Sequence, residues 1–203
     1  MSNKRSLERF LKPKSIALFG GGWSENVIQQ LQKSGYQGQI WPVHPKRNEM
    51  LGIKCYSDIA SLPVAPDAAF IGVNRDITHQ VVSDLSEMGA GGAICFASGF
   101  SEAEQEDDTG TDLQAQLVAA AGDMPILGPN CYGIVNALDG VALWPDRHGM
   151  SPVESGVAVI GQSSNVLINL TMQRRGLPLA AVVAAGNQAQ TSMSDLGIAL
   201  LED

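Results

Sequence analysis

Short apolar runs alternate with helical patterns along this chain, and no other feature restricts its fold as much. The runs with the length and composition of buried strands are residues 15–19, 40–43, 67–73, 93–97 and 125–127. Helical patterns lie between them, at about residues 24–34, after residue 73 and at about residues 102–121. This alternation of strands and helical patterns predicts an α/β fold, with a parallel sheet and crossover helices.

An apolar stripe marks the helix after the third strand. Ile77, Val81, Leu85 and Met88 follow one another at spacings of four, four and three residues, which predicts side chains that face the core. The next helical stretch opens with an acidic run at residues 102–108. We interpret this run as a solvated face that complements the N-terminus of a helix.

The region 134–155 shows no clear period and contains two prolines and two glycines, so we expect a junction between domains there. A second group of elements follows: strands at 156–160 and 180–185, and helices at about 163–175 and 192–201. The predicted domains are therefore residues 1–150 and 151–203. Because two parallel strands cannot bury both faces of a sheet, we expect a piece of a longer chain or a subunit that a partner completes.

Composition excludes several classes of protein. The chain has 203 residues, 44% of them hydrophobic, and a formal net charge of -8, which disfavours disorder and general nucleic-acid binding. The sequence contains no apolar stretch long enough to cross a bilayer and no secretory signal pattern. Cys55, Cys95 and Cys131 form no CxxC pair, which argues against a disulfide framework or a zinc site. We expect a cytoplasmic protein without nucleic-acid, membrane or metal partners.

Positive charge is concentrated in the first quarter of the chain. Residues 1–54 hold nine of the 13 Lys and Arg but three of the 21 Asp and Glu. Five of these cations precede the first strand, namely Lys4, Arg5, Arg9, Lys12 and Lys14. We interpret these five as a solvated N-terminal arm and weigh Lys46 and Arg47 separately.

Two segments share a strand, a glycine turn and a helix. They are residues 16–31 (IALFGGGWSENVIQQL) and 157–170 (VAVIGQSSNVLINL). Such turns favour anions, because the first N–H groups of a helix lack intrahelical partners and the helix dipole is positive there. The alternative is that both are ordinary βα units with no bound anion.

The end of the second strand distinguishes among nucleotide ligands. The first turn matches a dinucleotide fingerprint poorly, with Glu25 where a third Gly or Ala is usual. An NAD site needs an acid after the second strand, and this chain has His44, Pro45, Lys46 and Arg47 there. A cation suits a phosphorylated ribose, which favours NADP or coenzyme A over NAD. Lys46 is the candidate phosphate ligand, and the alternative is an ordinary surface lysine.

Six sequence blocks occur together in a fixed order. They are KSIALFGGG at 14–22, PVHPK at 42–46, ASGFSE at 97–102, GPNCYG at 128–133, VAVIGQSS at 157–164 and AGNQA at 185–189. In this order they resemble the CoA-binding portion of the nucleoside-diphosphate-forming acyl-CoA synthetases. That superfamily includes the succinyl-CoA synthetase alpha subunit and the ADP-forming acetyl-CoA synthetases. The resemblance runs from about residue 12 to the C-terminus.

The resemblance implies a fold and a set of ligand contacts. Residues 1–150 would form a Rossmann-like CoA-binding domain, and residues 151–203 the start of a flavodoxin-like domain. The residues that would hold coenzyme A are Gly20, Gly22, Trp23, Ser24 and Glu25 at the first turn, Lys46 on the phosphates, Ala97 and Ser98 along the pantetheine arm, and Asn130 near the thioester end. Ser163 and Ser164 would receive a phosphoryl group.

The resemblance also implies an activity for the intact enzyme. It would form acyl-CoA from a small carboxylic acid, CoA and ATP through a phosphohistidine, together with an ATP-grasp domain or subunit, and an oligomer is expected. His44, His79 and His148 do not match the phosphohistidine context, so this chain alone should bind CoA without turnover. The open alternatives are a non-catalytic CoA-binding regulatory module and an NADP-dependent oxidoreductase.

Two positions depart from the usual family motifs. The second turn reads GQSS at 161–164 where SQSG is common, and Gln190 stands where the GNxAD motif has its acid. Either change is compatible with altered phosphate handling or with a different acyl group.

Overall fold

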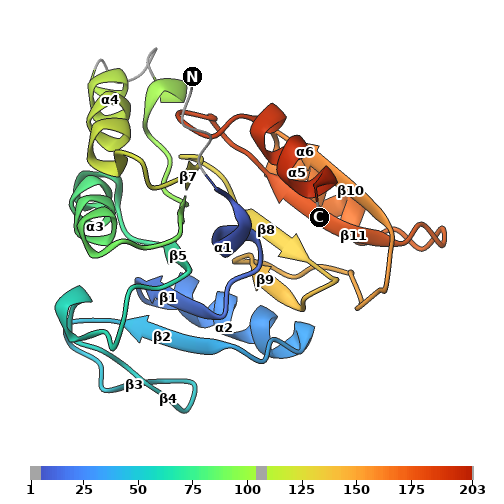
Figure 1. The fold of residues 1–203 in the computed structure, drawn as a ribbon, viewed down its shortest axis with the longest axis horizontal. Helices are drawn as coiled ribbons and strands as arrows, with labels where there is room; N and C mark the ends of the chain where they lie inside the picture. The colour runs from blue at the N-terminus through green and yellow to red at the C-terminus, as the bar shows by residue number, and fades with distance from the viewer. Residues whose placement is uncertain (1–5, 104–108, 203) are drawn as a thin grey trace.

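The computed structural model describes residues 6–103 and 109–202, and its first part is built on a five-stranded parallel sheet (Figure 1). The strand order is β2-β1-β5-β6-β7. The strands are β1 (Ser15–Phe19), β2 (Gln39–Val43), β5 (Ala68–Ile71), β6 (Ala93–Cys95) and β7 (Ile126–Leu127). All five predicted strands are confirmed, with ends that differ by at most two residues, and so is the α/β class.

Helices cover both faces of this sheet. They are α1 (Glu8–Leu11), α2 (Gly22–Ser34), α3 (Arg75–Met88) and α4 (Gly110–Ala121). Alternate residues of β1 separate the two faces: Leu18 packs in the apolar cluster that holds α1 and α2, and Phe19 packs in the one that holds α3 and α4. The central strands of the sheet are therefore buried on both faces, which explains why their sequences are continuously apolar.

Two helix predictions need correction. The buried residues of α3 are Thr78, Val82 and Leu85, whereas Ile77 is 50% exposed, so the expected stripe is rotated by about one residue. The fourth helix begins at Gly110 and not near residue 102; a 3-10 turn, η2, occupies Ser101–Ala103. Most of the acidic run, residues 104–108, lies outside the described residues.

A short hairpin joins the edge strand β2 to β5. It consists of β3 (Glu49–Met50) and β4 (Ile53–Lys54), which pair antiparallel. A 3-10 turn, η1 (Ile59–Ser61), follows, and the Asp58 side chain caps it by accepting from the Ser61 N–H at 2.8 Å. Residues 44–48, between β2 and this hairpin, lie at the carboxyl end of β2.

The second part of the chain is a four-stranded mixed sheet. Its strands are β8 (Gly133–Asn136), β9 (Val141–Leu143), β10 (Val157–Gly161) and β11 (Leu179–Ala184), in the order β10-β11-β8-β9. The pair β10 and β11 is parallel, and β8 is antiparallel to β11 and to β9. Two helices, α5 (Ser164–Thr171) and α6 (Met193–Leu201), complete this part.

The strands β8 and β9 correct the expectation of an irregular junction at 134–155. A tight turn joins them, in which the Asn136 Oδ1 accepts from the Leu138 N–H at 3.0 Å and the Asp139 N–H at 3.4 Å. Because β8 pairs with β11, the second sheet has four strands where the sequence predicted two. The division at residue 150 stays a prediction, and this pairing favours a boundary nearer residue 133.

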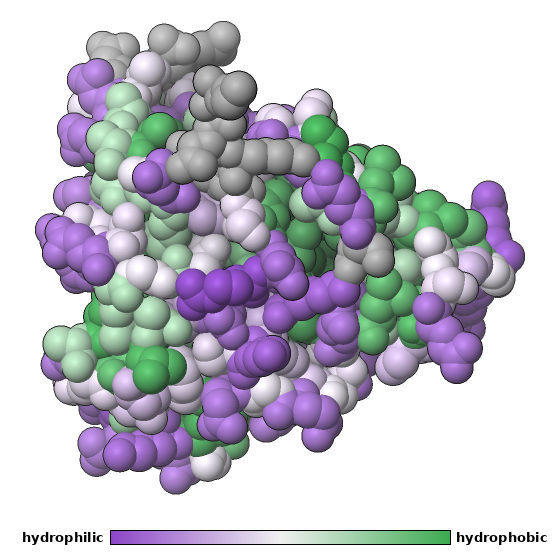
Figure 2. Space-filling view, in the orientation of Figure 1, coloured by the Kyte–Doolittle hydropathy of each residue, from purple (hydrophilic) through white to green (hydrophobic). Residues whose placement is uncertain are grey.

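One of the buried apolar clusters connects the two sheets. Val27, Ile28 and Leu31 of α2 belong to the same buried cluster as Leu143 of β9 and Val183 of β11. The second part leaves apolar side chains uncovered, among them Val166, which is 67% exposed, and Leu201, which is 88% exposed. Figure 2 shows apolar surface on the right of the view, where the second part of the chain lies in Figure 1. The strand β10 lies at the edge of its sheet, and none of its residues is fully buried.

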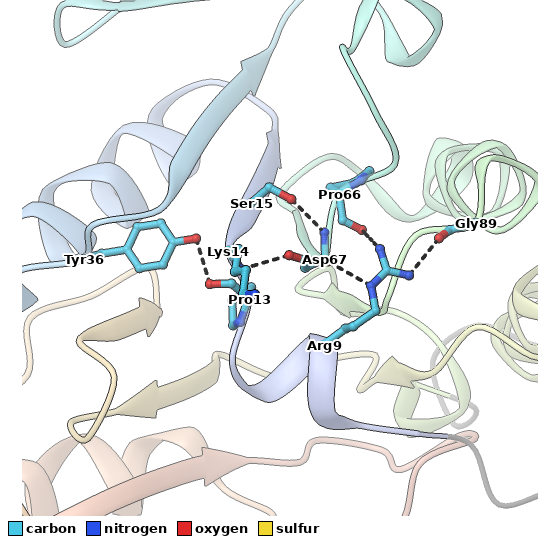
Figure 3. Close-up of polar contacts among 8 residues, drawn as sticks. All are labelled: Arg9, Pro13, Lys14, Ser15, Tyr36, Pro66, Asp67 and Gly89. Carbon is cyan, nitrogen blue, oxygen red and sulfur yellow. Dashed lines mark hydrogen bonds and ion pairs between the residues drawn. The ribbon is translucent and has the colours of Figure 1, made fainter.

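Polar contacts close the amino ends of β1 and β5 (Figure 3). The Arg9 Nε lies 2.8 Å from the Asp67 Oδ1 in an ion pair, and the Arg9 Nη1 donates to the Gly89 carbonyl at 3.2 Å. The Lys14 N–H donates to the Asp67 Oδ2 at 2.9 Å, and the Asp67 N–H donates to the Ser15 Oγ at 3.1 Å. Arg9 thus belongs to the structure and not to a solvated arm. We call this region the closed edge; Lys4 and Arg5 lie outside the described residues.

Candidate functional site

A cavity of about 960 Å³ lies at the carboxyl ends of the strands, opposite the closed edge. We call this side of the sheet the carboxyl edge. It is lined by Trp23 and by residues 72–76, 96–98, 130–132 and 162–165. The first four groups follow β1, β5, β6 and β7, and the last follows β10. Since α2 and α3 leave the neighbouring strands β1 and β5 toward opposite faces, the cavity lies at the topological switch point, where open α/β sheets bind ligands.

The first glycine turn is pressed against the loop after β5. Gly20 has φ +125°, and a Cβ atom there would lie 2.5 Å from the Gly72 carbonyl oxygen. A side chain is therefore excluded by both backbone conformation and space. Gly21 is the N-cap of α2 and supplies no side-chain cap, so the first N–H groups of this 13-residue helix face the turn without a competing side chain.

An ion pair holds a guanidinium over this turn. The Arg47 Nη1 contacts the Glu25 carboxylate, and a Cβ atom on Gly21 would lie 3.9 Å from the Arg47 Nη2. Lys46 is exposed, and its backbone N–H donates to the His44 Nδ1 at 3.1 Å. Within the part of the chain that the structure describes, the Lys46 ammonium makes no ion pair. Arg47 is thus a cation that the structure holds beside the turn.

The GPN segment is tied to two neighbouring loops. The Asn130 N–H donates to the Ala97 carbonyl at 2.9 Å. From the second part of the chain, the Asn187 N–H donates to the Pro129 carbonyl at 2.9 Å and the Ala189 N–H to the Gly128 carbonyl at 3.0 Å. The Gly128–Pro129 peptide is cis. These bonds bring the ASG, GPN and AGN blocks, which are far apart in sequence, to one place.

The second glycine turn reaches the cavity from the other side. Ser163 is the N-cap of α5 and makes no side-chain cap bond, and the Ser164 Oγ accepts from the Tyr132 N–H at 3.3 Å. The Gly186 N–H donates to the Gln162 carbonyl at 3.3 Å. The N-termini of α2 and α5 therefore open toward the same cavity, and both favour negative charge.

Aromatic rings form one wall of the cavity. The ring centroids of Trp23 and Phe96 are 4.7 Å apart, and those of Phe96 and Tyr132 are 5.6 Å apart. Behind these rings lie Phe70, 5.6 Å from Phe96, and Trp144, 5.4 Å from Tyr132. The sequence analysis did not identify Phe96 or Tyr132 as site residues, because aromatic residues at strand ends look like ordinary core.

A polar network links the ASG loop to the second part of the chain. Glu102 accepts from the Gly99 N–H at 2.6 Å and from the Asn187 side chain. Burial raises the pKa of Glu102, but these hydrogen bonds outweigh it and leave the pKa below its usual value. Arg75, which lines the cavity and was also missed, donates to the Gly99 carbonyl and lies 3.7 Å from the Asp76 carboxylate.

The predicted site residues divide into two groups. Those that line the cavity are Trp23, Ala97, Ser98, Asn130, Ser163 and Ser164. Those that lie outside its lining are Gly20, Gly22, Ser24, Glu25 and Lys46. The Ser24 side chain is fully buried and its hydroxyl has no hydrogen-bond partner, so Ser24 can offer a ligand its backbone but not its hydroxyl.

Gln190 has a structural explanation. Its Oε1 accepts from the Ile126 N–H at 2.9 Å, and its Nε2 donates to the Gly122 carbonyl at 3.1 Å and the Met124 carbonyl at 3.2 Å. All three partners belong to the segment that enters β7. The amide therefore replaces the family's acid with a bridge between the two parts of the chain, away from the cavity lining.

His148 and the three cysteines are buried, and Cys131 is the cysteine that lies in the cavity lining. His148 is buried, its Nε2 lies 3.3 Å from the Ser34 Oγ, and its carbonyl accepts from the Lys33 ammonium at 2.5 Å. Burial raises the pKa of Cys95 to about 12 and that of Cys131 well above its usual value. No cluster of three or more His, Cys, Asp or Glu suited to a metal occurs in residues 6–103 and 109–202. None of the helices in these ranges is long and apolar enough to span a membrane.

Comparisons with known proteins agree with the family resemblance that the six sequence blocks indicate. The family model described as a CoA binding domain matches residues 14–137. The chain is 31% identical to trans-feruloyl-CoA synthase FCS1 of an unknown prokaryotic organism, over 99% of this chain and 30% of that protein. It is 32% identical to the alpha subunit of the ADP-forming acetate–CoA ligase I of Pyrococcus furiosus, over 94% of this chain and 43% of that subunit.

A solved structure matches nearly the whole fold. The apo form of a dinucleotide-forming acetyl-coenzyme A synthetase 1 from Ca. Korarchaeum cryptofilum superposes with a TM-score of 0.86 at 28% identity. The match covers 98% of this chain and 44% of that one. The chain thus spans less than half the length of each of these relatives, and its resemblance to the ADP-forming acyl-CoA synthetases is confirmed.

Proposed function

The chain belongs to the CoA-binding domain family, and from that premise we propose that coenzyme A binds in the cavity at the carboxyl edge of the five-stranded sheet. The observation that carries the proposal is the convergence at one cavity of Trp23, which follows the first glycine turn, the ASG and GPN segments, and the second turn at Ser163 and Ser164. Coenzyme A has a phosphorylated end and an uncharged arm that ends in a thiol. The N-terminus of α2 suits the phosphates, and the ASG and GPN segments suit the uncharged arm.

The phosphates would lie at the N-terminus of α2. The helix dipole and the N–H groups after Gly20 and Gly22 favour an anion there. Arg47 adds a fixed positive charge and Lys46 an exposed one. The Glu25 carboxylate would repel a phosphate if it touched one directly, so we assign it the role of orienting Arg47.

The pantetheine arm would run from Trp23 along Ala97 and Ser98 toward Asn130. Carbonyl and amide groups of the arm can pair with the backbone of these loops, which the hydrogen bond between Asn130 and Ala97 fixes in place. Ser163 and Ser164, at the N-terminus of α5, would bind a phosphoryl group. The thiol and phosphoryl ends would then meet inside the cavity.

The activity that we propose for the intact protein is reversible formation of acyl-CoA from a carboxylic acid, CoA and ATP, with release of ADP and phosphate. This chain would supply CoA binding, and an ATP-grasp domain or subunit would supply the nucleotide chemistry. The relatives are named for acids as different as ferulate and acetate, and their names leave the acid of this chain open.

Calorimetric titration with CoA, dephospho-CoA and NADPH tests the proposal. CoA should bind most tightly, and loss of its 3′-phosphate or the change Lys46→Ala should weaken binding about two- to fivefold, as expected for one exposed charge contact. Arg174→Ala, which removes an exposed cation beyond the C-terminal end of α5, is the matched control and should leave the affinity unchanged.

Four results would separate the parts of this proposal. Tighter binding of NADPH than of CoA would contradict it as a whole. Equal affinities for CoA and dephospho-CoA would remove the contact with the 3′-phosphate without removing CoA, and an unchanged affinity in Lys46→Ala would remove Lys46 from the site. An equal loss in Lys46→Ala and Arg174→Ala would show a general charge effect.

A further inference from the structure

The proposed CoA contacts use one ring of the aromatic wall, Trp23, and leave Phe96 and Tyr132 without a role. The chain has only three Trp, three Tyr and five Phe, yet Trp23, Phe70, Phe96, Tyr132 and Trp144 form one continuous series of ring contacts. Three of these rings, Trp23, Phe96 and Tyr132, line the cavity. The ring planes are tilted by 39–73° to one another, so the series provides an apolar surface that offers both ring faces and ring edges to a ligand.

The two inner rings of the wall are supported from behind. Phe70 and Trp144 are fully buried, and they contact Phe96 and Tyr132 respectively. Phe96 and Tyr132 are only partly buried and line the cavity with the surface left free. Their orientation is therefore fixed before any ligand binds, which lowers the entropy cost of stacking a ligand on them.

Tyr132 lies where the acyl group must be. It follows Asn130 by two residues, and its N–H donates to the Ser164 Oγ at 3.3 Å. In the proposed reaction the acyl carbon lies between the thiol, near Asn130, and the phosphoryl group, near Ser163 and Ser164. The residue that connects these two places is Tyr132, so the tail of the acid would extend along its ring.

The charges around the wall suit an acid with a single carboxylate. Arg75 is the only Lys or Arg in the lining described above, and it already donates to the Gly99 carbonyl beside the Asp76 carboxylate. A second carboxylate on the substrate would therefore meet no dedicated cation. The polar groups of Ser98 and Asn165 in the lining could instead accept or donate to hydroxyl substituents.

We propose that the acid handled at this site is a planar aromatic monocarboxylic acid, whose ring packs in a tilted or edge-to-face arrangement against Phe96 and Tyr132. The inference rests on the proposed CoA function and specifies its acyl substrate. An offset or tilted ring pair of this kind contributes affinity beyond the area that it buries. A short aliphatic acyl group, by contrast, would leave most of the wall uncovered.

Titration of the 203-residue chain with CoA, acetyl-CoA and benzoyl-CoA tests this inference. We expect benzoyl-CoA to bind about three- to tenfold more tightly than acetyl-CoA, the range typical of one aromatic contact. Tyr132→Leu should abolish this preference while the affinity for CoA stays within about twofold. Tyr132→Phe keeps the ring and should keep the preference, and Tyr36→Leu, at the far end of α2, is the matched control.

Each possible result bears on the inference. Equal affinities for the two thioesters in the wild-type chain would overturn it and leave CoA binding intact. Equal weakening of all three ligands by Tyr132→Leu would also overturn it, because the wall would then support the arm or the fold. If Tyr132→Leu does not fold, Phe96→Leu carries the same expectation. Failure to bind CoA at all would overturn the proposed function, and this inference with it.

Discussion

Polar groups are paired within the chain at the closed edge of the five-stranded sheet, whereas helix N-termini are left without side-chain caps at its carboxyl edge. At the closed edge, Asp67 receives hydrogen bonds from Arg9 and from the Lys14 backbone, and the chain satisfies its own charges. At the carboxyl edge, the N-termini of α2 and α5 have no side-chain caps, and the loops around them line a cavity. The first arrangement serves stability, and the second leaves donors available to a ligand.

The helix α2 connects these two edges. Its first residue, Gly22, lies at the glycine turn, and its last turn carries Lys33 and Ser34, which contact the buried His148. A change at one end of this helix should therefore have a different consequence from a change at the other. Substitutions at the closed edge should alter stability alone, whereas those at the carboxyl edge should also alter ligand binding.

The largest effect is expected for Gly20→Ala. Because φ is +125° and the new Cβ would lie 2.5 Å from the Gly72 carbonyl oxygen, we expect a loss of about 2–4 kcal/mol in the free energy of unfolding, with loss of CoA binding. Urea denaturation measures the first and titration the second. Gly52→Ala is the control, since Gly52 also has positive φ, +81°, but nothing lies within 4 Å of its Cβ position. Equal losses in the two variants would contradict the close packing of Gly20.

A pH dependence is expected from His148. Burial, and then the charge of Lys33, lower its pKa to about 4, whereas an unfolded histidine titrates near 6.5. Between these values the unfolded chain binds a proton that the folded chain does not, so stability falls as the pH drops from 6.5 toward 4. The expected loss between pH 7 and pH 5 is about 2 kcal/mol.

Urea denaturation at the two pH values measures this effect. His148→Gln should flatten the dependence over this range, and His44→Gln, which changes a histidine at the end of β2, should keep it. A dependence that survives His148→Gln unchanged would show that another group causes it. CoA affinity should be the same in His148→Gln and in the wild type.

The smallest effect is expected for Arg9→Ala. Its side chain is 51% exposed, so solvent screens the ion pair, and we expect a loss of about 1 kcal/mol, or about 2–4 °C in melting temperature. CoA affinity should not change. A clear loss of CoA affinity would mean that the closed edge also shapes the cavity, and would remove the contrast between the two edges.

The sequence was sufficient to predict the parallel sheet. Central strands of such a sheet are buried on both faces, so runs such as SIALF at 15–19 are continuously apolar and easy to recognise. The strands β8 and β9 were missed although Asp139-Gly140 between two apolar runs is a strong hairpin signal. Pro145, Gly149 and Pro152 give the rest of this segment the composition of a loop, which masks the hairpin signal.

The candidate site was less predictable. Glycine turns and the GPN block identify backbone geometry, which a sequence pattern encodes directly. The contacts of Phe96, Tyr132 and Arg75 depend on how loops from different strands meet, and no local pattern encodes that. The network around Arg9 was missed for the same reason, since its partner Asp67 is 58 residues away.

Hydrogen exchange of the chain with and without CoA tests the contrast between the edges most directly. The account predicts slower exchange on CoA addition in residues 20–25, 72–76, 96–98 and 130–132, which surround the cavity. It predicts no change at the closed edge, around Arg9 and Asp67. Protection at the closed edge, or equal protection at both, would contradict the assignment of the carboxyl edge as the CoA site.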